Sequence, residues 1–141
     1  MKWIAKSLDD LAVVAKELIA ELKSRKRKSV LLDAPMGAGK TTLVTHLMKE
    51  MGIDDHATSP TFSIINEYFS VNYGKIYHFD FYRLEDESEA FDIGIEEIFE
   101  EDAYLFIEWP EKIENLLPEN SVVITITLDG QNRIIQLSDY D

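Results

Sequence analysis

Residues 34–42 combine the side chains that a phosphate-binding loop requires. The pattern G-x-x-x-x-G-K-[ST] binds phosphates when it follows a strand and opens a helix. Gly37 and Gly39 allow the backbone to curl so that successive N–H groups face one anion. Lys40 is expected to reach the β- and γ-phosphates, and the Thr41 hydroxyl to coordinate Mg²⁺. The predicted nucleotide contacts in this loop are Met36, Gly37, Ala38, Gly39, Lys40, Thr41 and Thr42.

Both flanks of this loop fit the pattern. Residues 29–33 hold a short apolar run that predicts a buried strand, and apolar residues recur at helical spacing over 43–51. One position departs, because Ala34 stands where the first glycine is usual. Alanine can close the turn from the strand if its φ is negative. The alternative is a strand-to-helix turn with a chance Lys-Thr pair.

Two carboxylates that end predicted strands are the candidates for metal and water chemistry. Asp80 follows the run 76–79, and Glu108 follows the more apolar run 104–107. A Mg²⁺ ion held by Thr41, phosphate oxygens and water needs one or two protein carboxylates. We favour Glu108 at the metal or its water shell, and Asp80 at the nucleotide or at an orienting water. Each also has a structural interpretation, Asp80 as a turn cap and Glu108 as a buried charge with a partner.

Thr61 and Trp109 each have two open interpretations, and His78 has a structural one. Thr61 either senses the γ-phosphate as a switch residue or belongs to a Pro-Thr turn. His78 shares a strand face with Asp80 and is expected to hydrogen-bond within the sheet. Trp109, beside Glu108, is either a core residue or an exposed anchor for a partner.

The composition restricts the class of protein. A chain of 141 residues without cysteine, with no apolar run long enough to span a membrane, predicts a single domain over residues 1–141 and a cytoplasmic protein. The formal net charge is −13. Proteins that grip a nucleic-acid backbone alone usually have a basic face, so direct RNA or DNA binding is disfavoured. The one basic cluster, residues 23–28, is better explained as a solvated helix end.

The remaining pattern predicts elements on both sides of the loop. Apolar residues from Leu8 to Leu22 form a helical stripe after the start signal at Ser7. The acidic residues 85–102 contain short helical patches, and are interpreted either as a solvated face or as a docking surface for a basic partner. We also expect a hairpin of strands 63–71 and 75–84, a short helix over 111–117, and a closing hairpin of strands 122–128 and 133–137.

Four motifs together resemble one family, TsaE. They are G-A-G-K-T-T at residues 37–42, S-P-T-F at 59–62, H-F-D-F-Y-R-L at 78–84 and E-W-P-E at 108–111. Their order and spacing cover nearly the whole chain. The resemblance implies an α/β, P-loop NTPase-like fold of three layers, with a mixed, mostly parallel central sheet and a β-hairpin extension.

The resemblance also implies an activity and partners. It implies ATP or ADP and Mg²⁺ as ligands, weak hydrolysis by the isolated protein, and docking on the TsaB–TsaD complex in tRNA threonylcarbamoyladenosine modification. TsaD would handle the tRNA, so this chain would meet tRNA only through its partners, and no membrane. By the same resemblance Lys40, Asp80 and Glu108 form the hydrolysis site, Thr41 and Glu108 serve Mg²⁺, and Trp109 is a partner contact. Lys112 and Arg133 are further nucleotide-contact candidates.

Three other functions compete. A small-molecule kinase usually clamps its phosphoryl group with arginines of a lid, and outside the basic cluster the chain offers Arg83 and Arg133. A GTPase is disfavoured because no N-K-x-D motif occurs. A nucleotide-gated binding module shares the same motifs, so it stays open.

Overall fold

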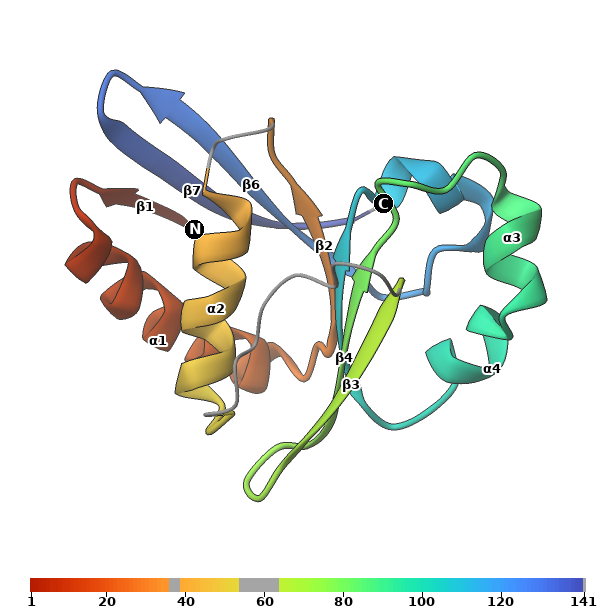
Figure 1. Cartoon of the computed structure of the whole chain (residues 1–141). Helices are drawn as coiled ribbons and strands as arrows, with labels where there is room; N and C mark the ends of the chain where they lie inside the picture. The colour runs from red at the N-terminus through yellow and green to blue at the C-terminus, as the bar shows by residue number, and fades with distance from the viewer. Residues whose placement is uncertain (36–38, 54–63, 141) are drawn as a thin grey trace.

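The chain forms an α/β structure around one seven-stranded sheet, seen in a computed structural model that describes residues 1–35, 39–53 and 64–140 (Figure 1). The strand order is β1-β7-β6-β2-β5-β4-β3. The strands are β1 (Lys2–Ala5), β2 (Ser29–Asp33), β3 (Ile65–Ser70), β4 (Gly74–Asp80), β5 (Tyr104–Glu108), β6 (Val122–Asp129) and β7 (Asn132–Asp139).

The middle of the sheet is parallel and both sides are antiparallel. β6, β2, β5 and β4 run parallel, whereas β3 pairs antiparallel with β4, and β7 with β6 and β1. The central strands β2 and β5 are apolar because helices cover both of their faces. The predicted mixed, mostly parallel sheet with a closing hairpin is therefore confirmed.

Helices form the two outer layers (Figure 1). On one face, α1 (Leu8–Arg25) and α2 (Lys40–Glu50) share an apolar core with residues of β2, β5 and β6. On the other face, α3 (Glu87–Asp92), α4 (Ile95–Phe99) and the 3₁₀ helix η1 (Pro110–Leu116) enclose a second core that is rich in aromatic side chains. The three-layer expectation is confirmed.

The first helix forms where its sequence predicts. Ser7 has an extended backbone and its side chain accepts a hydrogen bond from Asp10 N, as expected of an N-cap. The apolar stripe faces α2 and the sheet, except at its first member, because Leu8 is 59% exposed in the opening turn.

No helix among residues 1–35, 39–53 and 64–140 is long and apolar enough to cross a membrane.

Two strand predictions need correction. The expected strand over 75–84 ends at Asp80, because the Asp80 carboxylate accepts the Tyr82 N–H and turns the chain there. The strand expected over 63–71 covers Ile65–Ser70, and residue 63 lies outside the described residues. β1 was not predicted at all, since four residues at a sheet edge give little periodicity.

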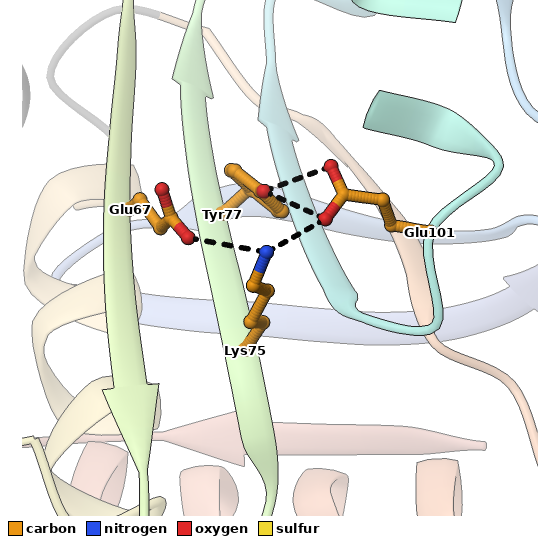
Figure 2. A network of polar contacts seen from close by, with 4 residues as sticks. All are labelled: Glu67, Lys75, Tyr77 and Glu101. Carbon is orange, nitrogen blue, oxygen red and sulfur yellow. Dashed lines mark hydrogen bonds and ion pairs between the residues drawn. The ribbon is translucent and has the colours of Figure 1, made fainter. Parts of the chain in front are cut away.

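Many carboxylates of the acidic segment 85–102 have structural partners. Lys75 on β4 pairs with Glu101 and Glu67, and the Tyr77 hydroxyl also donates to Glu101 (Figure 2). The hydrogen bond and charge of Glu101 raise the pKa of Lys75, and the hydrogen bond from Lys75 lowers the pKa of Glu101. Similar contacts join Asp102 to Lys28, Glu87 to Asn115, and Asp86 to the first turn of α3. Part of the segment therefore forms stabilising contacts with other elements, and it is not a fully solvated face.

Candidate functional site

The carboxyl ends of three neighbouring parallel strands meet at one edge of the sheet. In the register, Glu108 of β5 lies opposite Leu32 of β2 on one side and Asp80 of β4 on the other. Alternation then places both carboxylates on the face covered by α1 and α2, the face that also holds the start of α2. In open α/β sheets, ligands bind in the crevice at this edge.

An open pocket of about 500 Å³ occupies this edge. Its size falls within the range of ordinary ligand pockets. Among the described residues its lining comprises Pro35, Gly39, Lys40, Thr41, Thr42, Asp80, Tyr82, Glu108, Trp109 and Arg133.

Most predicted site residues therefore come together. Eight of the lining residues are ones that the sequence singled out, and they come from α2 and from the ends of β4, β5 and β7. Met36, Gly37, Ala38 and Thr61 lie outside the described residues, as does the whole motif 59–62. Lys112 does not line the pocket, because its ammonium donates to the carbonyl oxygen of Leu84 at 3.2 Å.

Gly39 shows why the loop needs a glycine before its lysine. Its φ is +94°, in the left-handed region that side chains rarely adopt. A Cβ at this position would also lie 2.6 Å from Nε of Arg133. Ala34, by contrast, is absent from the described non-glycine residues with positive φ, so the alanine replaces the usual glycine without that strain.

Arg133 reaches the loop because the closing hairpin extends past the strand beside it. β6 pairs with β2 only over Val122–Thr125, and its second half continues beyond the end of β2. Arg133 pairs with Leu128 in this outer half, one pair away from the last pair before the hairpin turn. The hairpin thus places one guanidinium on the side of the loop opposite to Asp80 and Glu108.

Lys40 is a nearly buried cation. The side chain belongs to a residue that is 9% exposed, and Nζ lies 4.2 Å from the centre of the Trp109 ring. Among the described residues no carboxylate forms an ion pair with Lys40. A cation–π contact of this kind only partly replaces water around an ammonium. A buried charge requires an opposite charge, so the site is suited to an anion.

Trp109 occupies a position that combines the two sequence-based alternatives. It is half-buried against the aromatic core, and its ring packs on Lys40 and on Tyr82, with 5.0 Å between the two ring centres. Its φ of 58° is left-handed, which costs energy for a tryptophan. The backbone there turns sharply from the buried end of β5 into η1.

The two carboxylates have different surroundings. Glu108 is buried and forms a hydrogen bond with His78, which is also buried. Asp80 is half-buried, and this burial raises the pKa of its carboxyl group above the ordinary value. The Tyr82 N–H bond opposes the rise, while the negative charge of Glu108 adds to it. Both residues line the pocket, and Glu108 is in addition fixed to a neighbouring strand by its bond with His78.

Sequence reasoning missed Tyr82 as a lining residue. Tyr82 follows the end of β4 by two residues, in the turn where the Asp80 carboxylate accepts its N–H, so its place depends on that turn rather than on strand alternation. Among the described residues no three His, Cys, Asp or Glu side chains gather to hold a metal alone. Thr41 and Glu108, which both line the pocket, are the side chains that could hold a Mg²⁺ ion together with phosphates and water.

Comparisons with known proteins agree with this arrangement. The family described as threonylcarbamoyl adenosine biosynthesis protein TsaE matches residues 5–135. The chain is 36% identical over 121 residues to the tRNA threonylcarbamoyladenosine biosynthesis protein TsaE of Haemophilus influenzae, across 86% of this chain and 76% of that protein. It is 36% identical over 134 residues to the Bacillus subtilis protein of the same name, across 94% and 80%.

A solved structure extends the agreement to the fold. The crystal structure of Bacillus subtilis YdiB matches with a TM-score of 0.72 and 29% sequence identity, across 100% of this chain and 86% of that chain. The P-loop NTPase-like α/β fold predicted from the sequence is confirmed.

Proposed function

The chain belongs to the TsaE family, and on this basis we propose that it is an ATPase that supports tRNA threonylcarbamoyladenosine modification. ATP and Mg²⁺ bind in the pocket at the start of α2. Hydrolysis by the isolated protein is weak, and docking on the TsaB–TsaD complex stimulates it. The threonylcarbamoyl transfer itself belongs to the partner complex, and tRNA is met only through it. The proposed setting is the cytoplasm.

The buried ammonium of Lys40 is the observation that carries this proposal. It lies at the N-terminus of α2, where backbone N–H groups and the helix dipole favour an anion. Its contact in the described part of the chain is an aromatic ring rather than a carboxylate. The Asp80 carboxylate interacts with this ammonium only through space. A polyphosphate in the pocket would place negative charge directly on it.

The residues present fit a magnesium nucleotide. Thr41 is the second residue of α2 and lines the pocket together with Glu108. We assign Thr41 to Mg²⁺, with Glu108 at the metal or at its water shell. When bound, the ion would neutralise charge on the β- and γ-phosphates. Glu108 and Asp80 would orient the attacking water, with Asp80 on the side open to the pocket.

The experiment measures ATP hydrolysis with and without TsaB–TsaD for wild type, Lys40→Ala and Glu108→Gln. We expect the partners to stimulate wild type. Lys40→Ala should lose most affinity for ATP and ADP, because the main charge facing the phosphates is gone. Glu108→Gln should retain nucleotide binding and lose hydrolysis, because the amide fills the same space without the negative charge.

Other outcomes would redirect the assignment. Unchanged ATP affinity in Lys40→Ala would contradict nucleotide binding at this loop. Normal hydrolysis by Glu108→Gln would give the leading role to Asp80. A stable complex with TsaB–TsaD without stimulation would favour a nucleotide-gated binding module, and neither binding nor stimulation would reopen the search for a small-molecule kinase.

A further inference from the structure

His78 and Glu108 form a buried polar pair beneath the pocket. Their exposed fractions are 1% and 2%, and a hydrogen bond joins His78 Nε2 to Glu108 Oε2. A carboxylate oxygen accepts, so the ring nitrogen donates. The rest of Glu108 lines the pocket, whereas His78 does not. One end of the pair is therefore in the proposed reaction site and the other is inside the sheet.

The register of the sheet explains the pair. Asp80 lies opposite Glu108, and His78 precedes Asp80 by two residues on the same face of β4. His78 is thus the diagonal neighbour of Glu108, with Phe106 directly opposite it. Phe106 is fully buried, so the hydrogen bond lies in an apolar environment where it is strong and where a lost partner is costly.

We propose that His78 is a positioning residue for ATP hydrolysis, holding the Glu108 carboxylate in the orientation that faces the bound nucleotide. This inference rests on the proposed function. His78 does not line the pocket, and it acts only through Glu108. It thereby gives a reaction role to the first residue of the motif 78–84, a histidine that could otherwise be read as a sheet hydrogen bond.

A glutamate needs such support because its side chain has three rotatable bonds. The hydrogen bond from His78, which lies on the neighbouring strand, fixes Oε2 of Glu108 and so selects one rotamer of the glutamate side chain. Losing a partner that orients a metal or water ligand typically lowers activity about 10- to 100-fold. Nucleotide affinity comes instead from Lys40 and the loop, so it should change little.

The test compares His78→Leu and His78→Gln with wild type in the TsaB–TsaD-stimulated assay. We expect His78→Leu to lower kcat about 10- to 100-fold, while ADP affinity, measured by calorimetry without turnover, changes less than about threefold. His78→Gln retains an N–H donor and should recover part of kcat. His46→Gln, a half-exposed histidine on α2 away from the pocket lining, is the matched control and should behave as wild type.

A double variant separates positioning from simple stabilisation. In Glu108→Gln there is no carboxylate to orient, so adding His78→Leu should lower kcat no further. The double variant also replaces the buried charge that loses its histidine partner in His78→Leu, which keeps the test available if that single variant is unstable. Multiplicative losses in the double variant would overturn the proposal.

Two further results would overturn this inference. One is a wild-type kcat in both His78 variants. The other is a fall in ADP affinity that parallels the fall in kcat, which would indicate a general loss of structure. The proposed function fails differently, through normal nucleotide binding in Lys40→Ala.

Discussion

At the scale of single residues, the site holds charged groups in partly or largely buried positions. Lys40 is nearly buried with its ammonium on an aromatic ring, and Asp80 is half-buried beside a second carboxylate. Such arrangements are common where a ligand supplies the missing charge or proton. For Asp80, the free protein should therefore gain stability when the charge is removed.

Asp80 gives a pH-dependent form of this prediction. Burial raises the pKa of its carboxyl group in the folded state, so the proton is held more tightly there than in the unfolded chain. The protonated carboxyl group therefore makes its full contribution to the stability of the folded state at pH values below the ordinary pKa of 3.8. This contribution is lost as the pH rises through the folded-state pKa. Asp80→Asn, which can still accept the Tyr82 N–H, should be more stable than wild type at pH 7.

Chemical denaturation of nucleotide-free protein at several pH values checks this. The stability difference between Asp80→Asn and wild type should shrink as the pH falls toward 4. A constant difference across the range would show that the Asp80 pKa is not raised by folding.

Most residues of the candidate site could be predicted from the sequence, but some of their contacts could not. The phosphate-loop residues and both carboxylates were predicted from their types and flanking runs, and eight predicted residues line one pocket. The hydrogen bond between His78 and Glu108 was not predicted, because it depends on how β4 and β5 pair. Lys112 was a nucleotide-contact candidate by the family resemblance, but its ammonium donates to the carbonyl oxygen of Leu84 and does not line the pocket.

At the scale of elements, local signals defined the helices well. The N-cap of α1 is the clearest case, since Ser7 both precedes the apolar stripe and accepts the Asp10 N–H at 3.3 Å. An N-cap serine stabilises a protein by about 1 kcal/mol relative to alanine. Ser7→Ala should lower the free energy of unfolding by about that amount.

A second serine in the same helix is the matched control for Ser7. Ser24 is exposed within the last turns of α1, so Ser24→Ala should change stability by less than about 0.5 kcal/mol. Urea denaturation of the two variants gives the comparison. Equal effects would show that the cap contributes nothing beyond helix propensity.

Elements without strong periodicity were predicted less well. β1 has four residues and gains its place from pairing with β7, a contact across almost the whole chain. β4 is shorter than its apolar run because a side-chain hydrogen bond turns the backbone after Asp80. In both cases tertiary or side-chain contacts, rather than local preference, set the boundary.

At the scale of the whole molecule, sequence predicted the layers but not the order of the strands. Parallel neighbours such as β2 and β5 are joined by long connections, so nothing local specifies that β5 lies between β2 and β4. That order decides which carboxylate is nearest the loop. It places Glu108 directly beside β2 and Asp80 one strand further away.

The acidic surface leads to a prediction about association. Many carboxylates of segment 85–102 have structural partners, whereas Asp92, Glu96 and Glu97 are exposed. If these three only belong to a solvated face, neutralising them should affect TsaB–TsaD binding no more than neutralising Asp9, Glu17 and Glu50 on the opposite layer. Each triple variant removes the same charge, so long-range steering changes equally.

Association kinetics of the two triple variants at low and physiological salt provide the measurement. We expect equal changes, which should diminish as salt screens the charges over about 10 Å at 0.1 M. A much larger loss for the variant on α3 and α4 would instead identify that layer as the docking surface.

The left-handed backbone of Trp109 has a consequence for engineering the protein. A glycine adopts a φ of 58° without strain, whereas a residue with a Cβ is strained there by about 1 kcal/mol or more. Trp109→Gly should therefore be more stable than Trp109→Ala by about 1 kcal/mol, although both lose the ring that rests on Lys40. Thermal unfolding and ATPase assays of the pair would separate backbone strain from ring contacts. If the glycine variant is also more stable than wild type and has no ATPase activity, residue 109 marks a trade-off in which thermal stability is lost in favour of activity.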